Sequence, residues 1–131
     1  MKAITLLISL AFIVGSCGFG DTAKTAEPTA DKFYKLLEKR DYDAIVKLID
    51  LKGTGTNAQD WVDVLVKREV LGEQKKVKKN MGFNTQYKNG VTTVELTYSC
   101  ELENGTTSEK IILVERGEVF KIFGYEFNQD V

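Results

Sequence analysis

Residues 89–105 read NGVTTVELTYSCELENG, and this stretch decides the fold. Between its two Asn-Gly pairs, apolar and polar residues alternate with the two-residue period of a strand that has one buried and one wet face. Each Asn-Gly pair predicts a tight type I′ turn, because both central residues of that turn need a positive φ. The stretch therefore predicts a long strand with an antiparallel neighbour on each side.

The chain on both sides of this strand extends the predicted sheet. Glu115–Glu118 predicts a third turn. Residues 111–114 and 119–127 are more continuously apolar, as in strands buried on both faces. The basic run 75–79 would form a first strand, which completes a four-stranded antiparallel meander.

The lysines of this basic run have two interpretations, and both stay open. They can protect an exposed sheet edge from pairing with other strands. They can also contact acidic lipid headgroups or another polyanion. Nucleic acid is not expected as a partner, because the formal net charge is only −1 and no aromatic residues are interleaved with the lysines.

Apolar residues before residue 72 recur at the three-to-four spacing of amphipathic helices. The spacing predicts helices that contain residues 33–37 and 42–49, separated by a break at Arg40-Asp41, with Asp41 as the N-cap of the second. A loop is expected at 52–55.

A third helix is expected after this loop. Thr56-Asn57-Ala58-Gln59 has the form of a capping box, residues 61–68 continue one helical face, and Gly72 follows the end. The predicted fold class is therefore α+β, with three N-terminal helices packed on a curved four-stranded antiparallel meander.

The N-terminus carries a targeting signal. Lys2 precedes an apolar run over 4–14, which is too short to span a bilayer and has the flanks of a secretory signal peptide. Val14-Gly15-Ser16-Cys17 resembles the lipobox of bacterial lipoproteins. This resemblance implies cleavage after Ser16, lipid attachment to Cys17, and a membrane partner in the cell envelope.

The lipobox resemblance also divides the chain. Residues 1–16 would be a lipoprotein signal peptide, 17–28 a lipidated flexible tether too small and polar to order itself, and 29–131 one domain. Lys2 is the only charged residue of 1–16, so its removal changes the formal net charge from −1 to −2. Gly18 rather than Asp after the cysteine favours the outer membrane, facing the periplasm, if the cell is Gram-negative.

Composition argues against most enzyme classes. The chain has no histidine, which removes the usual general base near neutral pH and the commonest neutral metal ligand. Cys100 would be the only cysteine left beside the lipidated one, so no triad, disulfide or Cys/His zinc site can form. Cys100 shares a strand face with Leu96 and Tyr98, which predicts a buried thiol that packs in the core. We expect no catalytic residue, no metal and no cofactor.

The last strand is unusually aromatic. Strict alternation places Phe120 and Ile122 on one face and Phe123, Tyr125 and Phe127 on the other. Two interpretations stay open: both faces pack in the core, or Tyr125 and Phe127 form an interface with a second subunit or a partner protein.

Residues 33–37 and 40–44, together with the order of helices and long hairpins, resemble the nuclear transport factor two-like superfamily, which has a cystatin-like cone. Small bacterial lipoproteins carry domains of this kind. The resemblance covers about residues 29–127 and implies a pocket between the helices and the concave face of the sheet. The large aromatics expected near such a pocket are Tyr34, Trp61, Tyr98 and Phe123.

The resemblance implies no single reaction, because one fold hosts many functions. Three functional hypotheses follow. The first is a lipid-anchored binding or interaction module for a small apolar ligand or an envelope protein. The second is an acid/base enzyme that uses a buried carboxylate or tyrosine in the pocket. The third is a structural homodimer of the envelope.

Overall fold

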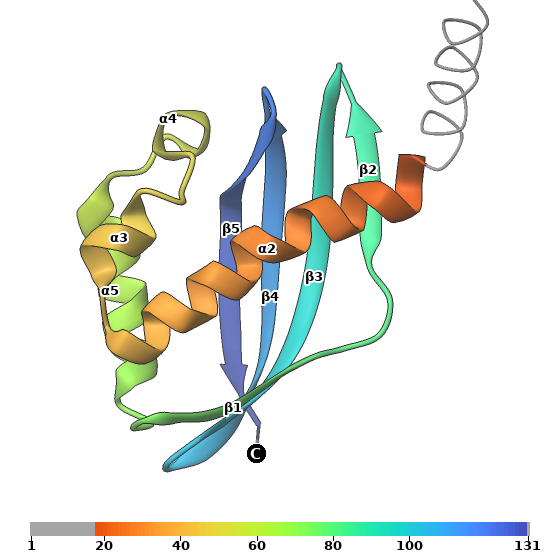
Figure 1. Cartoon of the computed structure of the whole chain (residues 1–131). Coiled ribbons are helices and arrows are strands. Elements are labelled where there is room, and N and C mark those ends of the chain that lie inside the picture. The colour runs from red at the N-terminus through yellow and green to blue at the C-terminus, as the bar shows by residue number, and fades with distance from the viewer. Residues whose placement is uncertain (1–17, 131) are drawn as a thin grey trace, which may run out of the picture.

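The computed structural model describes the backbone of residues 18–130 and the side chains of residues 25–130. This part of the chain forms four helices followed by five strands (Figure 1). The helices are α2 (Gly18–Lys39), α3 (Tyr42–Val46), α4 (Leu51–Thr54) and α5 (Ala58–Glu69), and the strands are β1 (Gln74–Lys79), β2 (Asn84–Lys88), β3 (Val91–Leu102), β4 (Gly105–Arg116) and β5 (Val119–Gln129). The predicted α+β class is confirmed. None of the described helices has the length and apolar character needed to cross a bilayer.

All five strands form one curved antiparallel sheet with the order β1-β3-β4-β5, in which β2 also pairs with β3. β2 pairs with the first half of β3, where Thr85 is opposite Val94, and β1 pairs with the second half, where Val77 is opposite Cys100. The predicted first strand at 75–79 is β1, and β2 is a fifth strand that was not predicted, joined to β1 by residues 80–83. Gly82, with φ +91°, lies in this connection.

The three predicted hairpins form, with one error of turn geometry. Asn89 and Gly90 have φ values of 55° and 77°, which confirms a type I′ turn. Gly117, with φ 67°, makes the third turn. At the second hairpin the pairing of Leu102 with Gly105 leaves Glu103 and Asn104 as the turn, and neither has a positive φ. The predicted type I′ turn centred on Asn104-Gly105 is therefore wrong.

The second helix is shorter than predicted. Asp41 is its N-cap, as predicted, and accepts a hydrogen bond from the Ala44 amide at 3.2 Å. The helix ends at Val46 because Ile49 leaves it to form a parallel bridge with Ile122 of β5. The predicted loop at 52–55 is largely α4, whose N-cap Asp50 accepts from the Gly53 amide at 3.0 Å.

The third predicted helix is α5, but its capping residue was assigned wrongly. Asn57, not Thr56, caps the helix: its side chain accepts from the Asp60 amide, and the Asp60 carboxylate accepts from the Asn57 amide, both at 3.0 Å. Thr56 instead accepts a hydrogen bond from the Trp61 indole at 2.7 Å. The side chain of Thr56 is therefore occupied by Trp61, five residues later in the chain, while Asn57 caps the helix.

The predicted flexible tether is also wrong from Gly18 onward, because α2 begins there. Ala26 and Ala30 are completely buried and continue the buried face of Phe33 and Leu37 toward the N-terminus. Small side chains let the helix approach the sheet closely, so tertiary packing stabilises a segment whose composition alone does not. The proposed signal peptide 1–16, with Ser16 and Cys17, lies outside the described residues.

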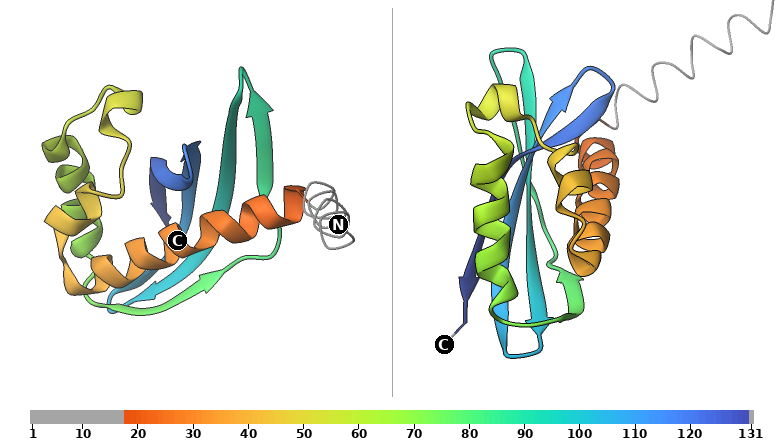
Figure 2. Two further views of the ribbon diagram at one scale, coloured as in Figure 1. Left: turned by 45° about the horizontal axis from the view of Figure 1, so that its top comes forward. Right: turned by 90° about the vertical axis from the view of Figure 1, so that its left-hand side faces the viewer.

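The core lies between α2 and the concave face of the sheet. α2 crosses this face diagonally, and α3, α4 and α5 lie at the end of the sheet near β5 (Figures 1 and 2). Cys100 is buried in this core, as predicted, and burial together with the nearby Glu109 carboxylate raises the pKa of its thiol to about 11.

A β-bulge in β5 overturns the predicted alternation of its aromatic residues. Leu113 pairs with Ile122 and Ile112 pairs with Gly124, so Phe123 is an extra residue in the strand. The bulge returns Tyr125 to the inner face, where its ring packs on Phe33 at 5.0 Å between centroids. Phe127, opposite the buried Glu109, shares that inner face and is half-buried. Tyr125 and Phe127 therefore do not form an outer aromatic face.

Candidate functional site

A buried carboxylate organises the inner face of the sheet. Glu109 of β4 is paired by register with Tyr98 and Phe127, and its side chain has no exposed surface. Four side chains donate hydrogen bonds to it. They are Tyr34 and Tyr125, each at 2.9 Å from Oε1, and Arg68 at 2.7 Å and Thr107 at 2.6 Å from Oε2.

These residues, together with Gln74, form the Glu109 cluster. Tyr34 comes from the middle of α2, Arg68 from the last turn of α5 and Tyr125 from the strand just after the bulge. Removing two charges from water is costly, and a buried ion pair becomes favourable only when further hydrogen bonds satisfy both partners. The three hydroxyl groups meet this need on the carboxylate.

The two tyrosines and the arginine of the cluster each keep a single protonation state at neutral pH. Burial, and then the charge of Glu109, raises the phenol pKa of both Tyr34 and Tyr125 far above the ordinary value. Burial opposes the charged form of Arg68, but the adjacent carboxylate outweighs it and raises the guanidinium pKa. The two tyrosines therefore stay hydrogen-bond donors, and Arg68 stays charged.

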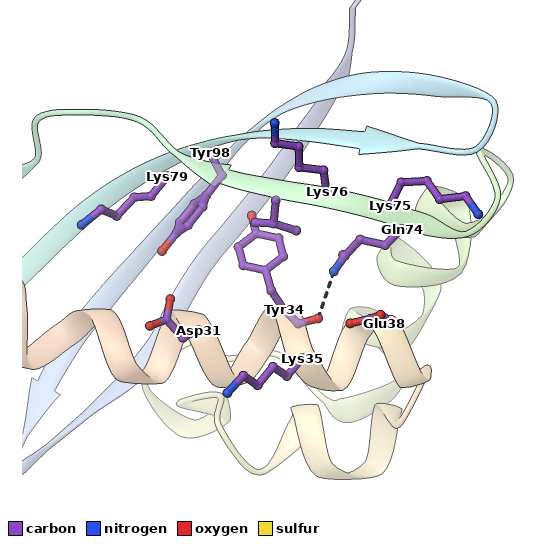
Figure 3. A pocket seen from close by; sticks show the side chains of 10 residues that line it. Asp31, Tyr34, Lys35, Glu38, Gln74, Lys75, Lys76, Lys79 and Tyr98 are labelled. Atoms are coloured by element: carbon purple, nitrogen blue, oxygen red, sulfur yellow. Dashed lines mark hydrogen bonds between the residues drawn. The ribbon is translucent and has the colours of Figure 1, made fainter.

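Gln74 connects this cluster to the surface. Its side-chain oxygen accepts from Nη2 of Arg68 at 3.1 Å, and its side-chain nitrogen donates to the backbone oxygen of Tyr34 at 3.2 Å. The first residue of β1 therefore joins α5 to α2 and forms one end of a cleft between α2 and β1 (Figure 3).

This α2–β1 cleft has a volume of about 400 Å³. Tyr34, Tyr98 and Val77 form its apolar part. Charged residues line the rest, namely Asp31, Lys35 and Glu38 from α2 and Lys75, Lys76 and Lys79 from β1. Figure 3 shows the lysine amines directed outward around the cleft, while the two tyrosine rings lie within it.

The Tyr98 hydroxyl is the distinctive feature of the cleft. The residue is only 2% exposed, and among residues 25–130 its hydroxyl has no hydrogen-bond partner. Figure 3 shows the hydroxyl pointing toward the Asp31 side of the cleft. Burial, followed by the charges of Asp31 and Glu27, raises the pKa of this phenol above its ordinary value. It is a protonated donor that makes no hydrogen bond to residues 25–130.

The structure brings two of the four predicted pocket residues together. The rings of Tyr34 and Tyr98 are 4.7 Å apart between centroids, and both line the cleft. Trp61 is buried on α5 against Thr56, and Phe123 is the half-buried bulge residue of β5, so neither lines the cleft.

Sequence reasoning missed the centre of the cluster. Glu109 lies two residues before Ile111 and therefore shares the inward face of β4, and Arg68 interrupts the apolar face of α5. A carboxylate and a guanidinium on two buried faces were the available signal for an ion pair. In the part of the chain that the structure describes, no group of three His, Cys, Asp or Glu side chains is placed to hold a metal ion.

Comparison of this chain with protein family models, with curated proteins and with solved structures finds no match.

Proposed function

We propose that this chain is a lipid-anchored binding module of the cell envelope and that the α2–β1 cleft is its ligand site. The observation that carries the proposal is the buried Tyr98 hydroxyl, which has no partner in the described structure. Leaving a buried donor unsatisfied costs roughly 1–3 kcal/mol. A ligand with a hydrogen-bond acceptor at this point recovers that cost and thereby gains affinity.

The lining of the cleft defines the ligand class. Tyr34, Tyr98 and Val77 offer an apolar surface, which suits the hydrophobic part of a small molecule. Four lysines against two carboxylates make the surroundings net positive, which favours an anionic group. We therefore propose a small amphipathic anion whose acceptor oxygen meets the Tyr98 hydroxyl.

Two sequence features support the anchored module. The lipobox resemblance of Val14-Gly15-Ser16-Cys17 supports lipid attachment at Cys17. The resemblance to the nuclear transport factor two-like superfamily implies a pocket between helix and concave sheet, and the α2–β1 cleft lies between those two layers.

The geometry of Glu109 favours binding over acid/base chemistry. Its two oxygens accept four hydrogen bonds, and its side chain has no exposed surface. A general base needs a free lone pair within reach of the substrate proton. Here each lone pair already holds a donor, so this carboxylate acts as the structural centre of the cluster.

Native mass spectrometry of the full chain, extracted gently from the membranes of its host, tests the proposal. We expect a reproducible non-covalent extra mass on the wild type. Denaturing spectra of the same samples separate covalent acyl chains from a bound ligand. Tyr98→Phe should lose the non-covalent mass, whereas Trp61→Phe, which does not line the cleft, should keep it. A wild-type chain that never carries such a mass, or equal retention by Tyr98→Phe, contradicts the cleft as a ligand site.

A further inference from the structure

Helix α2 restricts the orientation that a lipid-anchored domain can take on a membrane. α2 begins at Gly18, the residue directly after Cys17. With acyl chains on Cys17, no flexible spacer separates the bilayer from the helix. The surface around the first turns of α2 must then lie at the level of the lipid headgroups.

The surface around that end of the helix belongs to β1 and β2. Glu27 of α2 forms an ion pair with Lys79 at the end of β1, and α2 also contacts β2. Figure 1 and the left view of Figure 2 show the first turns of α2 beside β2. The connection between these strands, residues 80–83, follows directly after Lys79.

This region carries a concentration of exposed apolar side chains. Met81, Phe83 and Tyr87 are 99%, 50% and 70% exposed, within seven residues of chain. Single exposed apolar residues are ordinary, but a group of them indicates an interaction surface. Lys78 precedes the group and Lys88 follows it, and both are exposed.

We propose that Met81, Phe83 and Tyr87, here called the β2 patch, dock onto the surface of the bilayer that holds the anchor. The proposal rests on the lipid anchor at Cys17. Aromatic side chains favour the membrane interface, and flanking lysines attract anionic headgroups. The patch adds a second attachment beside the acyl chains and holds the domain in one orientation.

Docking of the β2 patch also orients the α2–β1 cleft. Lys79 lines the cleft, and Met81 follows it by two residues. One end of the cleft therefore faces the lipid headgroups. In this orientation, a small amphipathic anion could pass from the bilayer surface into the cleft without first diffusing into bulk water.

An environment-sensitive fluorophore at single positions tests the docking. Met81→Cys and Phe83→Cys place the probe in the β2 patch, and Val119→Cys places it at the β4–β5 turn, where the valine is 55% exposed. The buried Cys100 should not label. The full chain, purified with its anchor, is reconstituted into vesicles of phosphatidylethanolamine and phosphatidylglycerol in a 3:1 ratio, a probe composition chosen on the principle that anionic headgroups attract lysines.

We expect blue-shifted emission, and quenching by brominated lipids, at positions 81 and 83 but not at 119. Replacement of phosphatidylglycerol by phosphatidylcholine should weaken the effect.

Equal, water-like emission at all three positions on an acylated protein overturns the docking and leaves the anchor intact. A denaturing mass without acyl chains overturns the anchor and the docking with it. A shift at 81 that grows with protein concentration in the absence of vesicles assigns the patch to a second copy and also overturns the proposal.

Discussion

At the scale of single residues, the two tyrosines of the cleft differ in what their hydroxyl groups contact. The Tyr34 hydroxyl donates to Glu109 at 2.9 Å, whereas the Tyr98 hydroxyl has no partner in the described part of the chain. Their rings lie 4.7 Å apart between centroids and are similarly buried. They therefore form a matched pair for substitution by phenylalanine. The change removes a donor that makes a hydrogen bond at Tyr34 and a donor that makes none at Tyr98.

We predict opposite effects of Tyr34→Phe and Tyr98→Phe on the free energy of unfolding. Tyr34→Phe leaves a buried carboxylate one donor short and should lower that free energy by about 1–3 kcal/mol. Tyr98→Phe removes an unsatisfied buried group and should leave the free energy unchanged or raise it by about 1 kcal/mol in ligand-free protein. Urea unfolding followed by the fluorescence of Trp61 measures both. A loss of stability in Tyr98→Phe as large as in Tyr34→Phe would show that the hydroxyl has a partner.

Glu109→Gln should be far more damaging. It leaves the Arg68 guanidinium, with 5% of its side chain exposed, without a counter-charge. Breaking a buried pair from one side costs roughly 3–5 kcal/mol, whereas replacing both partners by apolar residues is often neutral. Urea unfolding should therefore show that Glu109→Leu combined with Arg68→Met recovers much of the lost free energy.

The matched control for this loss is a pair on the outside of the sheet. Glu126→Gln breaks the ion pair of Glu126 with Lys110, which is largely exposed, and should cost less than about 1 kcal/mol. If Glu109→Gln costs no more than this control, the cluster contributes little to stability and Glu109 is free to serve another purpose.

At the scale of elements, α2 shows how packing overrides composition. Ala26 belongs to the segment predicted as a tether, yet it is completely buried against the sheet. Ala26→Glu should lower the free energy of unfolding by several kcal/mol, roughly the cost of an unpaired buried charge. Lys32→Glu, on the exposed side of the same helix, should change it by less than about 0.5 kcal/mol. Thermal unfolding followed by circular dichroism compares the two variants. Equal midpoints would contradict the packing of Ala26 in the core and would support the predicted flexible tether at residues 17–28.

The elements also separate what the sequence could and could not predict. The hairpin at Asn89-Gly90 and the N-cap at Asp41 were predictable because both depend on neighbouring residues alone. The bulge at Phe123 was not, since an extra residue in β5 is defined only by its register against β4. Glu109 was missed for a similar reason, because its burial depends on Arg68, 41 positions earlier in the chain.

At the scale of the whole molecule, α2 connects every part of the proposed function. Its first residue follows the proposed lipid attachment site, its middle supplies Tyr34 to the Glu109 cluster, and its exposed side borders the cleft. A helix of 22 residues is about 33 Å long at 1.5 Å per residue. In the proposed function, this single rigid helix runs from the bilayer surface to the ligand site. The orientation of the helix on the bilayer therefore sets the orientation of the ligand site.

The opposite end of the molecule is held by an ion pair that makes stability depend on pH. Asp50, the N-cap of α4, accepts from Nε of Arg116 at 2.8 Å, and this contact joins the helical end to the β4–β5 turn. The hydrogen bond from Arg116, and then that from the Gly53 amide, lowers the pKa of Asp50 below its ordinary value. The folded state therefore binds the Asp50 proton less tightly than the unfolded state does.

Because of this difference, the ion pair makes its full contribution to the free energy of unfolding above the ordinary aspartate pKa of about 4. That contribution is lost as the pH falls from about 4 through the lower pKa of the folded state. Asp50→Asn should lower the free energy of unfolding at pH 7 by less than about 1 kcal/mol, because the pair is partly exposed. The gap between wild type and Asp50→Asn should be full at pH 7 and should narrow as the pH falls below about 4, because the unfolded carboxylate is protonated there before the folded one. Urea unfolding at pH 7 and pH 3 measures the gap, with Glu118→Gln in the exposed turn as the control that should show none. A gap that persists unchanged at pH 3 would mean that Asp50 acts through its side-chain oxygen as a cap rather than through its charge.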